Sequence, residues 1–264
     1  MAALQGSQMK VVGRLESSGT NVHLGLLQSI SPSITNEAAV EKGIGGYTKT
    51  RMTRYDQAIS LGGLVTSKDV LAFGTNTGNG VPPAVELRIH DAKLGSCYFG
   101  NMTISGGEDA PLEYSLDGMF LSIKTGATAP TAITPETYFV FSDATITWAS
   151  ETDTIRSFSL GKNQDVTGIY GTSMSPTDVE IGTATYEGEF VIASSTVSKI
   201  ATGAWDPAKA AISFEIKFVD ASSASHTITF SGTGAKITGA SGSVDPDSEF
   251  EVTQTFSFET FTIA

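Results

Sequence analysis

The chain has 264 residues, a formal net charge of −12, 28 glycines and one cysteine. The single cysteine excludes an internal disulfide framework and a thiolate metal cluster, and the acidic balance disfavours nucleic-acid binding by phosphate neutralisation. Charged residues make up only 17% of the chain, against about 25% in an average soluble protein. Threonine and glycine are frequent and the main helix formers are scarce, so the composition predicts a mainly β protein.

The amino-terminal stretch Met1–Lys10 lacks the charged-then-apolar pattern of a signal peptide. No apolar run reaches the 18 or so residues that cross a bilayer as a helix. The sequence therefore predicts a protein that is made and kept in a cytoplasm, or that leaves it as part of a larger particle.

Alternating apolar residues predict a series of elements in the first half of the chain. Val85, Leu87 and Ile89 alternate with polar residues, which is the period of a half-buried strand. Ser67 can cap a short helix, and glycine, acid and proline residues after Ile104 favour a loop. In chain order the expected elements are a strand at Arg51–Val65, a helix at Ser67–Phe73, strands at Val85–Ile89 and Cys97–Ile104, a loop at Ser105–Pro111 and a long strand from Leu112.

The second half repeats this order at an offset of about 126–138 residues. The expected elements are a strand at Val179–Ile192, a helix at Ser194–Ala201, strands at Ile212–Val219 and Thr227–Thr238, a loop at Gly239–Ser248 and a long strand from Phe250. Small residues and prolines make Gly126–Pro135 the expected connector. The sequence thus predicts a tandem duplication of β-sandwich or barrel modules with one short helix each: residues 1–125, a linker at 126–135, and residues 136–264.

Both long final strands change the parity of their apolar residues. Leu121 and Ile123 follow Phe120, and Phe261 and Ile263 follow Phe258. Such a change indicates a bulge or a passage from one face to another.

The residues that usually carry chemistry form no pattern. His23, His90 and His226 have no cysteine or carboxylate neighbours at metal-ligand spacing. There is no G-x-S-x-G elbow, and no Ser/His/Asp set is marked out by its context. The sequence predicts no catalytic residues, no metal site and no cofactor, and so not an enzyme.

One family resemblance rests on the second half. The stretch Tyr186–Phe190 leads toward a serine-capped helix and then Ile212–Val219, and Ile155–Leu160 precedes the long polar loop Gly161–Pro176. This arrangement resembles the tail tube proteins of long-tailed bacterial and archaeal viruses. The resemblance covers most of residues 20–264 and is one of architecture and rhythm.

The resemblance implies a structural virion protein. In that family six β domains close a ring with a continuous barrel as its inner wall, and stacked rings form the hollow tube through which DNA is delivered. Fused-domain members build the ring from three chains. For this chain, whose two halves match, the resemblance implies a homotrimeric ring. It also implies no cofactor, no membrane, and location in the virion tail after assembly in the host cytoplasm. Further implied partners are the tape measure, tail terminator and distal tail proteins, in a non-contractile tail.

Charge separates the two predicted modules. Residues 1–132 carry a net charge of −1, and residues 133–264 carry −11. Opposite charges occupy matching segments and could pair where modules meet, or the acidic set could face a lumen that DNA crosses without binding. The candidate residues are Lys49, Arg51 and Arg54 in the first half, and Asp178, Glu180, Glu187 and Glu189 in the second.

Two long polar segments, Asn36–Thr48 and Gly161–Pro176, are expected to be loops that bridge one ring to the next.

Two other interpretations of the protein's function stay open. One is a hexameric tube domain in residues 1–135 followed by an immunoglobulin-like decoration domain. The other is a surface adhesin or carbohydrate-binding β protein, which should carry a secretion signal and an exposed aromatic platform.

Overall fold

The computed structural model describes residues 10–42, 48–108, 110–131, 137–148, 154–194, 212–220, 223, 225–243 and 250–264. Strands make up 68% of the structure and helical turns 3%, which confirms the mainly β prediction. The strands form one 13-stranded sheet and a separate two-stranded sheet, and every strand pair is antiparallel.

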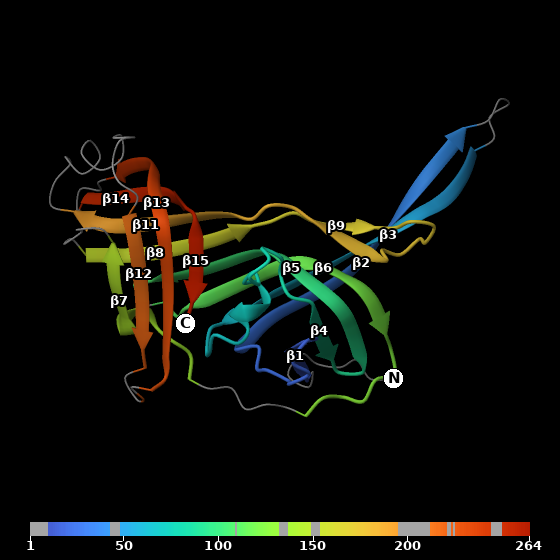
Figure 1. Cartoon of the computed structure of the whole chain (residues 1–264), viewed down its shortest axis with the longest axis horizontal. Helices are drawn as coiled ribbons and strands as arrows, with labels where there is room; N and C mark the ends of the chain where they lie inside the picture. Colours follow the sequence, from blue (N-terminus) through green and yellow to red (C-terminus); the bar gives the residue numbers. More distant parts are fainter. Residues whose placement is uncertain are drawn as a thin grey trace.

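The first half contributes six strands to the large sheet (Figure 1). They are β1 (Val11–Leu15), β2 (Leu26–Lys42), β3 (Thr48–Leu64), β4 (Val85–Ile89), β5 (Ala92–Gly107) and β6 (Glu113–Lys124). The second half adds β7 (Ala144–Trp148), β8 (Thr154–Asn163), β11 (Thr185–Ser194), β12 (Ile212–Val219), β13 (Thr227–Ser243), β14 (Phe250–Phe258) and β15 (Thr260–Ile263). The small sheet is a hairpin of β9 (Val166–Ile169) and β10 (Asp178–Ile181).

The same strand order occurs in both halves. The first half runs β2-β3-β6-β5 and continues through β4 to β1; the second runs β8-β11-β14-β13 and continues through β12 to β7. Strand β5 pairs with β8, so the two sets of four join into one sheet of eight strands. We call this the inner sheet, and the pairing of β5 with β8 the internal seam.

Three irregularities of register recur at matching places. Strands β2 and β8 each carry one extra residue opposite β3 and β11. Strand β5 has one bulge opposite β4 and another opposite β6, and β13 has the same two opposite β12 and β14. In the bulges opposite β4 and β12, Ser96 and Gly234 both have a positive φ, of 50° and 69°. Corresponding residues lie 127 to 138 positions apart, as Val85 and Ile212 or Ser96 and Gly234 do.

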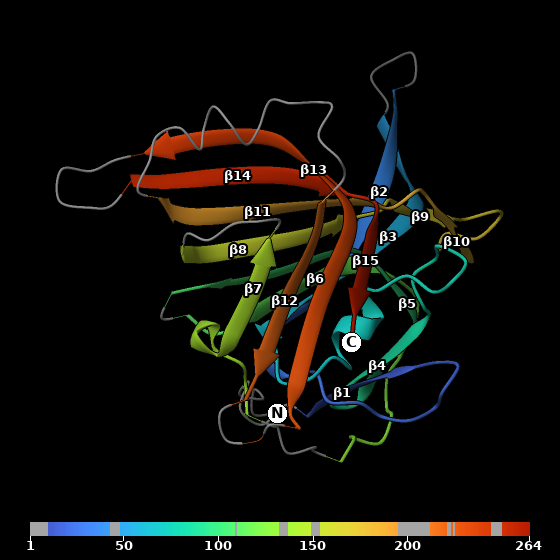
Figure 2. The same ribbon diagram turned by 60° about the vertical axis from the view of Figure 1, so that its left-hand side comes forward.

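Long strands pass between two layers of a sandwich in each half. Residues 227–235 of β13 pair with β12, whereas residues 236–243 pair with β14. Figure 2 shows β13 bending from the layer of β14 and β11 into the layer of β12 and β7. We call this second layer, and the matching layer of β4 and β1 in the first half, the outer layer. The parity change after Phe258 has its explanation here, because Glu259 separates β14 in the inner sheet from β15, which pairs with β13 in the outer layer.

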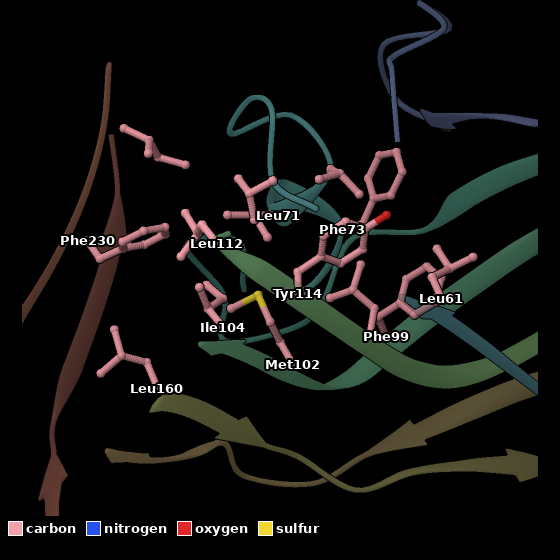
Figure 3. Packing of buried hydrophobic residues seen from close by; sticks show 14 of the residues in the cluster. Leu61, Leu71, Phe73, Phe99, Met102, Ile104, Leu112, Tyr114, Leu160 and Phe230 are labelled. Atoms are coloured by element: carbon pink, nitrogen blue, oxygen red, sulfur yellow. The ribbon is translucent and has the colours of Figure 1, made fainter. Parts of the chain in front are cut away.

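The apolar residues of both halves form one core between the layers. In the first half Leu61, Phe73, Phe99 and Tyr114 are almost fully buried (Figure 3). In the second half Trp148 contacts Phe190, Phe214 and Phe256, at ring-centroid distances of 5.0, 6.4 and 4.7 Å. The Trp148 indole N–H donates to Gln254 Oε1 at 2.9 Å, which satisfies both buried groups.

The predicted helices and loops differ from the structure. Only a 3₁₀ turn, Leu71–Phe73, forms within the helix expected at residues 67–73; in the second candidate, Ser194 ends β11 and residues 195–201 lie outside the described residues. The predicted loop at Asn36–Thr48 is wrong for residues 36–42 and 48, which are strand. The loops expected at 105–111 and 239–248 are likewise wrong where β5 continues to Gly107 and β13 to Ser243.

Beyond the sheet, β2 and β3 continue as a two-stranded hairpin that projects away from the body (Figure 1). We call residues 33–42 and 48–56 the arm. Exposed apolar side chains on it include Ile34 and Met52, at 49% and 47% of their full accessibility. The loop expected at 161–176 is wrong for residues 161–163 and 166–169, which belong to β8 and β9, whereas residues 164, 165 and 170–176 lie outside the strands.

Candidate functional site: the polar face of the inner sheet and its open edges

One face of the inner sheet is polar across both halves. Directly paired residues of antiparallel strands project on the same face. The row that crosses the internal seam contains Ser115, Thr103, Gly161, Glu187 and Ser257, in that order. Neighbouring rows have the same small polar character, whereas the opposite face carries the buried residues of the core.

This polar face is hollowed around the seam. The hollow has a volume of about 580 Å³ and is open to solvent. Its lining comes from β5, β8, β11, β13 and β14: Thr103, Ser159, Gly161, Asn163, Glu187, Gly188, Glu189, Thr238, Thr255, Phe256 and Ser257. Two of the candidate residues, Glu187 and Glu189, therefore lie together on this face.

Carboxylates dominate the charge of the polar face. Glu187 and Glu189 have no cationic partner among the described residues. Glu113 and Asp117 on β6 pair with Ser105 and Asn101 and so share the face; they were not among the sequence candidates, although their alternation with Tyr114 and Leu116 is the signal that could have found them. Lys236, paired with Ser257, is a cation on the same face.

The internal seam is fastened on its core side by two buried polar side chains. Lys162 is 1% exposed and donates from Nζ to the carbonyl of Gly74 at 2.8 Å. Burial lowers its pKa to about 8. Gln164 donates to the carbonyls of Gly80 and Gly182 at 2.9 and 2.8 Å. The seam thus has a connection between the halves in addition to backbone pairing.

Each end of the inner sheet is an open edge. Among the residues that the structure describes, β2 pairs only with β3, and residues 236–243 of β13 pair only with β14. In the matching part of the first half, Met102–Gly107 of β5 has β6 on one side and β8 on the other. The free side of β13 therefore corresponds to the side of β5 that the internal seam occupies.

The basic candidates lie on β3 in the arm. Arg54 pairs with Glu37 at 2.8 Å and with Asp56 at 3.6 Å, and its guanidinium lies 5.3 Å from the Tyr170 ring centroid. Lys49 and Arg51 pair by backbone register with Glu41 and Ala39. Arg54 thus finds its carboxylates within its own arm, and pairing between the basic and acidic sets at a junction stays a prediction.

The remaining acidic candidates, Asp178 and Glu180, are exposed on β10. The connection between β9 and β10 contacts the base of the arm. The Tyr170 hydroxyl donates to Asp56 at 2.6 Å, and the Tyr55 N–H donates to the Met174 carbonyl at 2.8 Å. A segment of the second half therefore covers the edge of β3 beyond the end of β6.

A separate charge cluster lies in the outer layer of the first half. The carboxylate of Glu86, 5% exposed, accepts from Arg14 at 2.8 Å, from Arg88 at 2.8 Å and from Lys93. Burial opposes ionisation of this carboxyl, but the hydrogen bonds from Lys93, Arg14 and Arg88 outweigh it and lower its pKa to about 2. Its neighbours make this a structural ion cluster.

Over the described part of the chain, no three histidine, cysteine or acidic residues are grouped so as to hold a metal ion. No helix in that part is long and apolar enough to cross a membrane. No protein-family model and no curated protein matches the sequence.

Proposed function

We propose that this chain is a tail tube protein of a long-tailed virus, and that three copies form a ring with a pseudo-sixfold inner wall. Rings of this kind stack into the hollow tube that delivers the viral DNA. The observation that carries the proposal is the inner sheet: two equal sets of four strands, one polar face and two open edges.

The open edges favour closure by further copies of the chain. An exposed edge strand presents unpaired N–H and C=O groups and is a site for strand addition. Joining β13 of one copy to β2 of the next repeats, between chains, what the internal seam does within one chain. Closing the sheet into a barrel removes both edges.

The charge of the polar face suits a wall past which DNA moves. If this face lines the lumen, Glu113, Asp117, Glu187 and Glu189 repel phosphates at the short range left by a Debye length of about 8–10 Å. A basic wall would instead bind DNA through counterion release. The exposed arm, with its apolar and basic residues, is available for contacts with the next ring.

The strand order distinguishes this proposal from its rivals. A tube domain followed by a decoration domain would place the second half outside the wall, whereas here both halves supply matching strands to one sheet. A trimer is therefore favoured over six whole chains in a ring. An adhesin gives no reason for the paired open edges.

Microscopy of the purified chain tests assembly. We expect negative-stain images to contain hollow rings or tubes, and native mass spectrometry to show a trimer. Discrete monomers at all concentrations would contradict the proposal, and six chains per ring would contradict the equivalence of the halves.

A pair of charge reversals tests the assignment of the face. Glu187→Lys with Glu189→Lys should leave folding intact and create salt-sensitive DNA binding inside assembled tubes, seen as slowed exchange of encapsulated DNA. The matched control, Asp178→Lys with Glu180→Lys, changes charge equally on β10, off the inner sheet. Equal DNA retention by both variants would contradict a lumenal position for Glu187 and Glu189.

A further inference from the structure

We infer that Ser31–Ile34 of β2 pairs with Ala240–Ser243 of β13 in a second copy of this chain, and that Pro32 weakens this joint relative to the internal seam. This inference rests on the proposed ring. It goes further by assigning the register of the joint between chains and a residue that controls its strength.

The register follows from the internal seam. There Met102–Lys162, Thr103–Gly161, Ile104–Leu160 and Ser105–Ser159 are directly paired. The recurring bulges place β13 residues 138 positions after their β5 counterparts, and β8 residues 128 positions after their β2 counterparts. Transferred to the open edges, the four pairs become Ala240–Ile34, Ser241–Ser33, Gly242–Pro32 and Ser243–Ser31.

Both strands are accessible at these positions. Residues 31–34 are all exposed, and so are residues 241–243. The side chains are small on β13, so a second strand can approach its edge closely. The joint also places Ser33 and Ser241 on the polar face, as Gly161 and Thr103 are in the internal seam.

Pro32 occupies the position of Leu160. A residue in an antiparallel strand directs its N–H and C=O to the same side, and proline is accommodated in a sheet where that side faces away from the neighbouring strand. Because β3 pairs with β2 on one side, residue 32 directs its backbone toward the open edge. Its missing N–H removes one hydrogen bond from the joint between chains.

The fastening residues of the internal seam also have no counterpart on β2. Ile34 stands at the position of Lys162, and Asn36 at the position of Gln164. The joint between chains therefore lacks both the buried lysine and the glutamine that connect the two halves. The difference makes the chain a stable unit and its assembly the weaker, reversible step.

Engineered disulfides test the register. Cα atoms of directly paired antiparallel residues lie about 4.5–5.5 Å apart, within disulfide range. We expect Ser33→Cys with Ser241→Cys to give covalent dimers and closed covalent trimers on oxidation. Ser29→Cys with Ser241→Cys, displaced by four residues, is the matched control and should give none. Thr103→Cys with Gly161→Cys should close within one chain.

The outcomes separate the inference from the proposed function. Tubes in micrographs without a covalent product from Ser33→Cys with Ser241→Cys would overturn the register and leave the tail tube proposal standing. Equal products from the displaced pair would also overturn it. Neither tubes nor covalent products would overturn both.

A substitution that restores the N–H tests the role of Pro32. Pro32→Ala should lower the concentration at which half of the chains are assembled by about two- to tenfold, the factor for one net backbone hydrogen bond. Ser31→Ala on the same edge is the control and should leave it unchanged. Sedimentation across a concentration series measures both, and an unchanged midpoint for Pro32→Ala would overturn the assignment.

Discussion

The two halves have the same framework and differ in how its spaces are filled. Strand order and three bulges recur, including a positive φ at Ser96 and at Gly234. In the outer layer, however, Gly13 pairs with Leu87 where Trp148 pairs with the matching Phe214. A Cβ on Gly13 would lie 2.5 Å from the Phe73 ring. Phe73 therefore fills, in the first half, the space next to this strand that the Trp148 side chain fills in the second half.

This comparison shows which properties the fold constrains most strongly. Register and bulges set where each strand leaves one layer for the other, and a change there would move every later side chain to the wrong face. Core side chains can be exchanged as long as volume is conserved. Exposed elements such as the arm face neither constraint, which explains why the halves differ most there.

Removal of Trp148 should have the largest effect. Trp148→Ala empties the centre of the aromatic group in the second half and leaves Gln254 without its donor, so we expect a loss of about 3–5 kcal/mol in unfolding free energy. Chemical denaturation measures it. Tyr138→Ala, at a 43% exposed aromatic residue, is the control; an equal loss there would contradict a special role for Trp148.

Neutralising Glu86 should be the next most damaging change. Glu86→Gln leaves Arg14, Arg88 and Lys93 close together without their carboxylate, and we expect a loss of about 2–3 kcal/mol. The folded pKa of about 2 lies below the ordinary 4.5, so this stabilisation is full above pH 4.5 and declines as pH falls toward 2. The matching residue Ser213 is exposed, so Ser213→Ala should change little; acid unfolding at the same pH in wild type and Glu86→Gln would refute the account.

Adding one methyl group at Gly13 tests whether Phe73 fills, in the first half, the space that Trp148 fills in the second half. Gly13→Ala should cost about 1–3 kcal/mol through overpacking. Combining it with Phe73→Leu should cost less than the two changes summed, which a double-mutant cycle detects. Strict additivity would show that the two residues do not share a space.

Lys162 should make the free energy of unfolding depend on pH, an effect that its non-titratable counterpart Ile34 cannot have. Its folded pKa of about 8 lies below the ordinary 10.5; between pH 8 and 10 the unfolded chain therefore binds more protons, and stability rises with pH. Lys162→Met should remove this rise. Parallel slopes for the two proteins in that window would show that Lys162 is not the group responsible.

Arg54 should have the smallest effect. Its pairs with Glu37 and Asp56 are exposed, so Arg54→Ala should cost about 0–1 kcal/mol. Arg51→Ala, on the same strand, is the control for the loss of charge. A loss above about 2 kcal/mol would mean that the arm depends on this residue for its conformation.

Local pattern predicted the buried strands well and the exposed ones poorly. Alternation at Val85–Ile89 and Ile212–Val219 matches β4 and β12, because the apolar side chains that alternate with polar ones along each strand pack into the core. The β2 side of the arm was missed because residues 31–40 are exposed on both faces and so have no apolar period, whereas the strand predicted at Arg51–Val65 includes residues 51–56 of the β3 side. The expected helix at Ser67–Phe73 is shorter because Val70, Leu71 and Phe73 are fully buried around one tight turn.

The seam itself had no local signal. Thr103 and Gly161 are 58 residues apart, and nothing near either one indicates the pairing. Lys162 looked like part of a polar loop, whereas its burial depends on Gly74 and Phe99. Glu187 and Glu189 were identified as charges, but the surface that they share with Glu113 and Asp117 exists only once β5 meets β8.

The two strands of the internal seam belong to one polypeptide, and this has a kinetic consequence. The pairing of β5 with β8 is intramolecular and is therefore independent of how much protein a cell has made. A joint between separate chains forms at a rate proportional to the square of the chain concentration. A ring in which every second joint is tethered would therefore respond less steeply to expression level than one built from single-domain subunits.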